Sequence, residues 1–152
     1  MKVFISHKST DAQIASVIYS EFKKHGAEAY LDVLDSFSGD GEKLTNHIRE
    51  QLNKCSDIIV VMSELTKTSW WVPFEIGMSA QVEMPTATYL TTSITLPDFL
   101  TYWPQLSKLS DIAKYVTVRK RVWRTDSLFE SRMTSKTYST GEFYRQLKAE
   151  LR

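Results

Sequence analysis

The stretch that decides the fold is Ile58-Ile59-Val60-Val61-Met62, an unbroken apolar run rich in β-branched residues. A strand with one face in water alternates apolar and polar residues, whereas a strand covered on both faces reads as a continuous apolar run. We therefore place residues 58–62 at the centre of a sheet that carries helices on both faces.

Strand-like and helix-like segments alternate on either side of this run. Residues 3–5, 29–31 and 87–91 are short apolar segments that predict three further strands. Between them, apolar residues recur at helical spacing, at Ile14, Ala15, Ile18 and Phe22, at Leu44, Ile48 and Leu52, and in a third helix that begins between Ser69 and Pro73 and runs towards Val82. This order predicts right-handed crossovers and a flavodoxin-like, three-layer α/β/α fold with a five-stranded parallel sheet.

The chain after residue 92 carries weaker signals. Tyr115-Val116-Thr117-Val118 predicts the fifth strand, at an edge of the sheet, and residues 105–106 favour a short helix. Residues 96–100 resemble a loop, and residues 125–139 lack periodicity and are interpreted as loop with at most one helical turn. A closing helix opens at residues 140–142 and places one apolar face on Phe143, Leu147 and Leu151.

Composition limits the class of protein. The 152 residues suit one domain over residues 1–152, and the net charge of +1 gives no electrostatic reason to expect nucleic acid or a membrane as partner. The basic run 119–121 with Arg124 is interpreted as a solvated segment or a protein contact. Cys55 stands alone, which excludes an internal disulfide and favours a small buried hydrophobe over a reactive thiol. The N-terminal apolar stretch is too short for a leader or a membrane helix, so we expect a cytoplasmic protein.

Candidate site residues follow the strands, because open α/β sheets bind ligands beyond the carboxyl ends of their strands. Glu75 is the foremost of them. Pro73 tolerates only the first turn of a helix, so Glu75 lies near a helix N-terminus, at the expected mouth of a cleft. A carboxylate there suits stabilisation of a developing cation. The alternative is a first-turn glutamate that only stabilises its helix.

Other residues at the same edge could line a binding site. Trp71 precedes Glu75 by one turn and could form a stacking wall, or Trp70 and Trp71 could be core or interface anchors. Asp32 could bind a hydroxyl or cap its turn, and it opens a glycine-bearing loop that lacks the spacing of a phosphate-binding motif. His7 and Lys8 could meet a phosphate or a ring, or lie in a solvated loop. The histidines and the cysteine show no metal-ligand spacing, and we expect His25 and His47 at the surface.

Five segments resemble Toll/interleukin-1 receptor (TIR) domains, bacterial ones especially. They are similar to the first strand and loop, the second strand, the BB loop, the central strand and the Ser-x-Trp-x-x-x-Glu helix start of that family. The segments are Val3-Phe4-Ile5-Ser6-His7-Lys8-Ser9-Thr10-Asp11, Ala29-Tyr30-Leu31-Asp32, the stretch that ends at Gly41, Ser56-Asp57-Ile58-Ile59-Val60-Val61-Met62-Ser63 and Ser69-Trp70-Trp71-Val72-Pro73-Phe74-Glu75-Ile76-Gly77. The likeness covers roughly residues 1–92 well and the remainder loosely.

The resemblance implies a function. Many such TIR domains cleave the nicotinamide–ribose bond of NAD, with NAD as substrate and no further cofactor. Glu75 matches their catalytic glutamate, and the substrate-binding matches are Ser6, His7, Lys8, Asp32, Gly39 and Trp71. Stand-alone bacterial chains of this kind resemble the TIR component of anti-phage systems such as Thoeris. That likeness implies self-association and a diffusible product, ADP-ribose-derived and in some cases cyclic, that reaches a separate effector.

Two other functions remain open at this stage. One is a non-enzymatic adaptor that works by TIR–TIR assembly, although the intact Ser-x-Trp-x-x-x-Glu segment argues against it. The other is a nucleoside deoxyribosyltransferase-like enzyme, which is also flavodoxin-like and also uses a glutamate.

Overall fold

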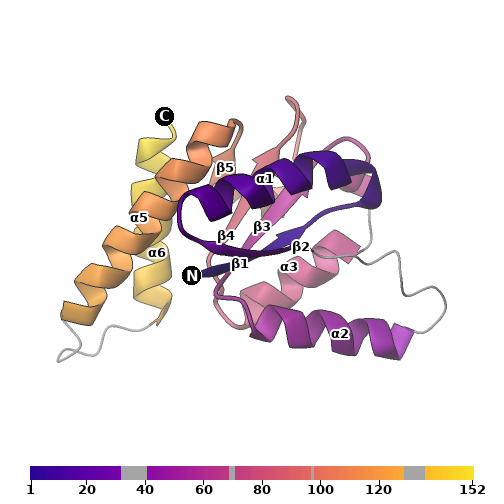
Figure 1. Ribbon diagram of the computed structural model, residues 1–152, viewed down its shortest axis with the longest axis horizontal. Coiled ribbons are helices and arrows are strands. Elements are labelled where there is room, and N and C mark those ends of the chain that lie inside the picture. Colours follow the sequence, from indigo (N-terminus) through magenta and orange to yellow (C-terminus); the bar gives the residue numbers. More distant parts are fainter. Residues whose placement is uncertain (32–40, 69–70, 97, 129–135) are drawn as a thin grey trace.

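The computed structural model describes residues 1–31, 41–68, 71–96, 98–128 and 136–152, and Figure 1 shows its ribbon. Within these ranges, five parallel strands form one sheet in the order β2-β1-β3-β4-β5. The strands are β1 (Lys2–Ser6), β2 (Glu28–Leu31), β3 (Asp57–Met62), β4 (Thr86–Leu90) and β5 (Gln105–Leu106). The predicted flavodoxin-like fold with a five-stranded parallel sheet is confirmed.

The helices alternate with the strands as the apolar spacing predicts. The α-helices are α1 (Ala12–Lys24), α2 (Gly41–Asn53), α3 (Trp71–Gln81), α4 (Asp98–Thr101), α5 (Leu109–Leu128) and α6 (Lys136–Glu150), and the 3-10 helices are η1 (Ser9–Asp11) and η3 (Thr66–Thr68). Gly26 follows α1 with φ +72°, a left-handed conformation that favours glycine, and it ends the helix as expected.

The central strand β3 explains why one stretch decides the fold. Every residue of β3 is buried, and the strand pairs with β1 on one side and β4 on the other. Successive side chains point to opposite faces. Ile59 and Val61 therefore join one apolar core, while Ile58, Val60 and Met62 join the other. The prediction of a strand covered on both faces is confirmed.

The two cores assign the helices to layers. Apolar side chains of α1, α5 and α6 share the core that contains Ile59, and those of α2 and α3 share the core that contains Ile58. Figure 1 shows the same arrangement, with α2 and α3 lying together on the side of the sheet away from α1. Because parallel strands all end at one edge of such a sheet, the loops after β1 and β3 and the start of α3 meet there.

The fifth strand is not where the sequence places it. Tyr115–Val118 lies inside α5, and the short edge strand is Gln105–Leu106, which pairs with Thr88 and Tyr89 of β4. The β-branched residues misled the prediction, because the longer pattern is helical. Along α5 each buried residue before the last is followed by another three or four residues later, as on one broad face of a helix. The buried residues are Asp111, Ile112, Tyr115, Val116, Val118, Arg119 and Val122.

Three shorter segments also differ from expectation. Residues 105–106 form the strand β5 and not a short helix. Residues 98–101 form α4 rather than a loop. The segment 125–139 was interpreted as loop, but α5 continues to Leu128 and α6 already begins at Lys136. Phe143 and Leu147 of α6 are buried as predicted, so only the start of the closing helix is wrong.

Candidate functional site

The site candidates converge where β1 ends beside α3. Ser6 is the last residue of β1, and Glu75 lies on α3, one turn after Trp71. The Ser6 hydroxyl donates a short hydrogen bond to Glu75 Oε2. Ser6 and Glu75 are 1% and 0% exposed, so this contact between a hydroxyl and a carboxylate is closed off from solvent. The structure therefore brings together two of the predicted site residues, which stand far apart in the sequence.

Glu75 is buried, whereas the sequence placed it at the mouth of a cleft. The inner face of α3 consists of Val72, Glu75, Ile76 and Ser79, all of them buried. These positions follow the spacing by which a helix lays one face against a core. The same spacing was readable in the sequence and predicts the burial of Glu75. A carboxylate is costly to bury, so its place on this face needs a reason other than packing.

A second polar cluster lies at the same edge and was missed in the sequence. Ser63, directly after β3, donates a 2.8 Å hydrogen bond to Asp11 Oδ2, and the Thr66 hydroxyl donates a short one to the same oxygen. The Thr66 backbone N–H donates to Ser63 Oγ at 3.1 Å. All three residues are buried. Asp11 makes no side-chain cap to α1, because its carboxylate instead ties the start of α1 to the segment after β3.

His7 and Lys8 extend from the end of β1 at this edge, half-buried. His7 Nδ1 lies 3.3 Å from the Ile5 carbonyl, and because a carbonyl only accepts, Nδ1 carries the proton. Lys8 Nζ donates to the Leu65 carbonyl at 3.4 Å, across to the segment after β3. Both residues therefore follow Ser6 at this edge, and neither contacts Glu75 in the described hydrogen bonds. Their role in substrate binding stays a prediction.

Two other predicted site residues, Asp32 and Gly39, lie outside the described residues. Trp70 and Phe37, an apolar residue of the BB-like loop that ends at Gly41, also lie outside them. Trp71 begins α3, but its side chain is outside the described part of the structure. The proposed stacking wall and the contacts of the BB-like loop stay predictions.

The other histidines and the cysteine take ordinary roles. His25 Nε2 lies 2.9 Å from Glu21, and His47 lies 3.1 Å from the hydroxyl of Tyr30. Burial raises the pKa of the half-buried Cys55 to about 11, which opposes formation of the thiolate and favours the hydrophobe over the reactive thiol. Among the described residues, no cluster of His, Cys, Asp and Glu side chains could hold a metal ion.

The basic run was wrongly interpreted at one position. Arg119 is buried, and its Nε donates to Asp57 Oδ1 at 2.6 Å while Nη2 donates to Oδ2 at 3.3 Å. The Tyr115 hydroxyl donates to the same carboxylate at 2.9 Å, and burial together with that charge raises the pKa of Tyr115 well above its usual value. This network lies at the amino end of β3, opposite the Ser6–Glu75 edge. Arg121 is solvated as predicted, and it contacts Glu150 at 3.3 Å.

The solved structures that are similar to this chain include the following two. The chain is similar to a 2-deoxyribosyltransferase from Bacillus psychrosaccharolyticus, with 11% identity over 74% of this chain and 90% of that one and a TM-score of 0.62. It also matches the TIR domains of the activated Roq1 resistosome, with 14% identity over 97% of this chain and 81% of that one and a TM-score of 0.48. At such identities the first likeness shows a shared fold alone.

Family assignment rests on sequence. No curated protein sequence matches the chain significantly. In the described parts of the chain, no helix has the length and apolar character needed to cross a membrane. The family model for the TIR domain matches residues 3–127, which include every strand of the sheet and the Ser6–Glu75 contact. The chain therefore belongs to the TIR domain family.

Proposed function

We propose that this TIR domain cleaves the bond between nicotinamide and ribose in NAD, and that Glu75 is the catalytic residue. The observation that carries the proposal is a fully buried glutamate on the inner face of α3, held by Ser6 at the ligand-binding edge of the sheet. Buried ionisable groups in such positions are concentrated at functional sites. TIR domains often have NAD hydrolase activity, which agrees with this placement.

The chemistry needs one well-placed negative charge. When the C1′–N bond of NAD breaks, the electron pair leaves with nicotinamide, and the ribose becomes an oxocarbenium-like cation. A carboxylate held against that ribose stabilises the developing charge, as carboxylates do in glycosidases. Water then adds to C1′ and loses a proton, so the products are ADP-ribose, nicotinamide and one proton. A purine nitrogen of the same molecule as nucleophile gives a cyclic isomer instead.

Neighbouring residues are assigned supporting roles in this proposal. Ser6 is a positioning residue, because its hydroxyl orients the Glu75 carboxylate. Asp11, Ser63 and Thr66 hold the segment after β3 against the start of α1 and thereby set the shape of the edge. His7 and Lys8 would face the phosphates of NAD. The proposed roles of Trp71 in stacking, and of Asp32 and Gly39 in ribose or phosphate contacts, rest on the TIR resemblance.

The burial of Glu75 suggests why such an enzyme would need activation. A carboxylate with no exposed surface meets substrate only after the groups that cover it move aside. We propose that self-association of TIR domains drives this opening and that the isolated domain is weakly active. Activity per molecule should then rise with protein concentration, and Phe37→Ala in the BB-like loop should flatten that rise. Constant activity per molecule from a monomer would contradict the assembly step and leave NAD cleavage standing.

The biological setting is part of the same proposal. A diffusible ADP-ribose-derived product, either ADP-ribose or a cyclic isomer, would activate a separate effector protein in the bacterial cytoplasm during anti-phage defence. NAD serves as substrate in this scheme, and no other cofactor is needed. The support for this setting is the resemblance of residues 1–92 to bacterial TIR domains.

The experiment that tests the proposal separates three functions. The purified chain is incubated with NAD and, separately, with deoxynucleosides, over a wide range of protein concentration, and released base is quantified by chromatography. Release of nicotinamide from NAD alone is expected. Release of a nucleobase from deoxynucleosides alone would replace the proposal with a deoxyribosyltransferase-like activity. Concentration-dependent assembly without release of either base would indicate an adaptor.

A further inference from the structure

Helices α2 and α3 line an apolar groove that the proposed function does not use. The two helices lie on the same side of the sheet (Figure 1), and the groove between them has a volume of about 530 Å³. Small-molecule pockets are commonly of this size, mostly apolar and placed between helices. The apolar part of the lining comes from α2, from α3 and from the residue directly after α3, and it consists of Leu52, Pro73, Phe74, Gly77, Met78 and Val82.

The outer face of α3 is apolar although it faces solvent. Phe74 and Val82, which line the groove, are 37% and 45% exposed, and Pro73 is exposed as well. The buried Glu75 lies on the inner face of the same helix and does not line the groove. A surface helix usually turns its polar side to water, and contiguous exposed apolar groups mark interaction sites. The groove is therefore a binding surface separate from the proposed NAD site.

Gly77 deepens the groove at the middle of α3. Glycine is less favourable than alanine inside a helix, so its presence there needs a reason. The backbone supplies none, because Gly77 has no positive φ. Packing supplies none either, because a Cβ at Gly77 would meet no atom of the surrounding structure within 4 Å. Since Gly77 lines the groove, a side chain at this position would instead occupy the groove itself.

One cation lies on the α2 side of the groove. Among the described residues that line it, Arg49 alone carries a charge. Its Nη2 donates to Asn46 Oδ1 at 2.8 Å, and no carboxylate of the described residues lies within ion-pair distance. A guanidinium has five N–H donors and the Asn46 amide is neutral, so Arg49 keeps both charge and donors for an anion. The groove thus combines an apolar floor with one positive charge.

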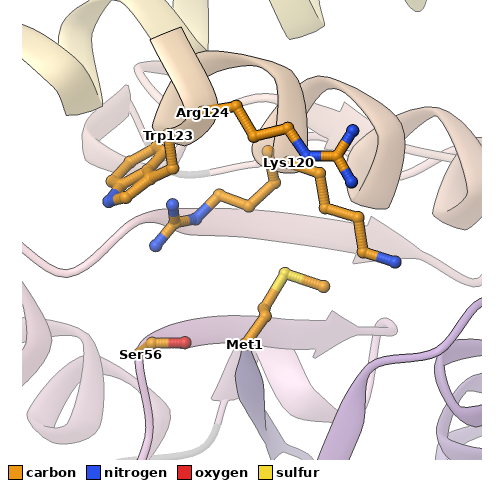
Figure 2. A pocket seen from close by; sticks show the side chains of 6 residues that line it. Met1, Ser56, Lys120, Trp123 and Arg124 are labelled. Carbon is orange, nitrogen blue, oxygen red and sulfur yellow. The ribbon is translucent and has the colours of Figure 1, made fainter. Parts of the chain in front are cut away.

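A second cationic hollow, at the amino edge of the sheet, differs in this respect. Figure 2 shows this hollow, which has a volume of about 440 Å³ and is lined by Trp123 and by cationic side chains of α5. There the Arg119 guanidinium is paired with Asp57 and lies 3.0 Å from the centroid of the Trp123 ring. That cation and that ring face already satisfy each other within the fold, so we place the ligand in the α2–α3 groove.

We propose that this groove binds a free medium-chain carboxylate, with the carboxylate on Arg49 and the alkyl chain along α3 over Gly77. The lining residues from Pro73 to Gln81 span about 12 Å of helix, so the groove suits an extended chain rather than a compact ring. One positive charge matches a monoanion, and a guanidinium can bind a carboxylate through two parallel hydrogen bonds. Burial of the methylene groups supplies the apolar part of the binding free energy. The proposal does not depend on NAD cleavage.

Calorimetric titration of the full chain with octanoate, below the concentration at which it forms micelles, tests the proposal. Octanol, octylammonium and acetate are titrated in the same way, since they remove the charge, reverse it and remove the chain, respectively.

Two variants remove the two halves of the site, and each has a matched control. Gly77→Leu fills the groove, and Gly141→Leu is its control, because Gly141 is also inside a helix and a Cβ there also meets nothing within 4 Å. Arg49→Gln removes the cation. Lys54→Gln is its control, because Lys54 is exposed directly after α2 and does not line the groove. Folding is checked by circular dichroism, and Arg49→Gln, at an exposed position, keeps the test decisive if Gly77→Leu unfolds the chain.

Octanoate should bind one-to-one, at least about tenfold more weakly in Gly77→Leu and in Arg49→Gln, and within about twofold of the wild type in the two controls. Octanol, octylammonium and acetate should each bind the wild type at least about tenfold more weakly than octanoate. Absence of octanoate binding at millimolar ligand, or binding that both site variants leave unchanged, would overturn the proposal. Equal binding of octanol or octylammonium would also overturn it, because the groove would then take up alkyl chains regardless of their charge.

Discussion

Both edges of the sheet contain a buried carboxylate, but different groups hold them. At the amino edge, Asp57 is 0% exposed and is neutralised by the Arg119 guanidinium, with Tyr115 as a further donor. At the carboxyl edge, Glu75 is equally buried and receives the Ser6 hydroxyl, while Asp11 receives two hydroxyls. A guanidinium cancels the charge of its partner, whereas a hydroxyl only orients it. Asp57 is therefore tied to the fold by a buried ion pair, whereas Glu75 at the carboxyl edge is the carboxylate to which we assign the chemistry.

The largest expected effect on stability is at the amino edge. Asp57→Ala leaves Arg119 buried without its counter-charge and removes the acceptor of Tyr115. The free energy of unfolding should fall by about 3–5 kcal/mol, as when one partner of a buried ion pair is removed. Urea denaturation measures it. The double variant Asp57→Leu with Arg119→Met should recover part of the lost stability. If Asp57→Ala lowered the free energy of unfolding by less than Glu75→Gln does, the distinction between the two edges would be contradicted.

Asp11→Ala should have the next largest effect. It removes the oxygen that accepts from both Ser63 and Thr66, and two buried hydroxyls lose their partner. A loss of about 2–3 kcal/mol in the free energy of unfolding is expected. Asp11→Asn keeps an acceptor oxygen and should lose clearly less. If the two variants are equally unstable, the charge of Asp11 rather than its hydrogen bonds holds the segment after β3.

Ser6→Ala tests whether the Ser6 hydroxyl at the carboxyl edge has a role in catalysis beyond its role in stability. The variant removes the donor to Glu75 and should cost about 1–2 kcal/mol of unfolding free energy. A positioning role also predicts a fall in the kcat of nicotinamide release with little change in KM. Ser9→Ala, an exposed hydroxyl in the same loop, is the control and should change neither quantity. Unchanged kcat in Ser6→Ala would leave the hydroxyl with a structural role only.

The smallest effect concerns alkaline pH at the amino edge. The folded pKa of Cys55 is raised to about 11 from a reference of 9.0, so the folded state holds the thiol proton more tightly than the unfolded state. This contribution to stability is present below pH 9 and is lost as the pH rises from 9 to 11. Tyr144, whose burial raises its pKa to about 12, extends the decline to higher pH.

Cys55→Ala should flatten the first part of that decline, as measured by urea denaturation at a series of pH values. In the wild type, the thiol should also react more slowly with iodoacetamide in the folded state than in urea at the same pH. Equal rates would show that the thiol is not protected by burial.

Strands with a strong local pattern were predictable from the sequence. The two-residue strand β5 was missed, and a segment of the helix α5 was wrongly predicted as a strand. The burial of Ile58–Met62 was predictable from its composition, because every residue of the segment is apolar. Gln105–Leu106 contains too few residues to show a period of two, and its pairing with β4 arises from tertiary contact. Tyr115–Val118 looks like a strand only when it is separated from the helical spacing of its neighbours.

The site was predictable in outline and not in its contacts. The rule that ligands bind beyond strand ends, together with Pro73, identified Glu75 at this edge, and the TIR resemblance added Ser6. The burial of Glu75 follows from its spacing with Val72, Ile76 and Ser79, but a charged residue at an inner position counters the usual expectation. The Asp11–Ser63–Thr66 cluster joins segments more than 50 residues apart, which local patterns cannot reveal.

The most direct test of the account measures nicotinamide release by Glu75→Gln beside its thermal unfolding midpoint. Glutamine preserves the volume and an acceptor for the Ser6 hydroxyl, so the midpoint should change by only a few degrees, roughly what 1 kcal/mol produces. Release of nicotinamide from NAD should fall by about 100-fold or more, as expected when a charge that stabilises the transition state is removed. Glu64→Gln, an exposed glutamate in the segment after β3, should keep wild-type activity. A folded Glu75→Gln protein that releases nicotinamide at the wild-type rate would contradict the account.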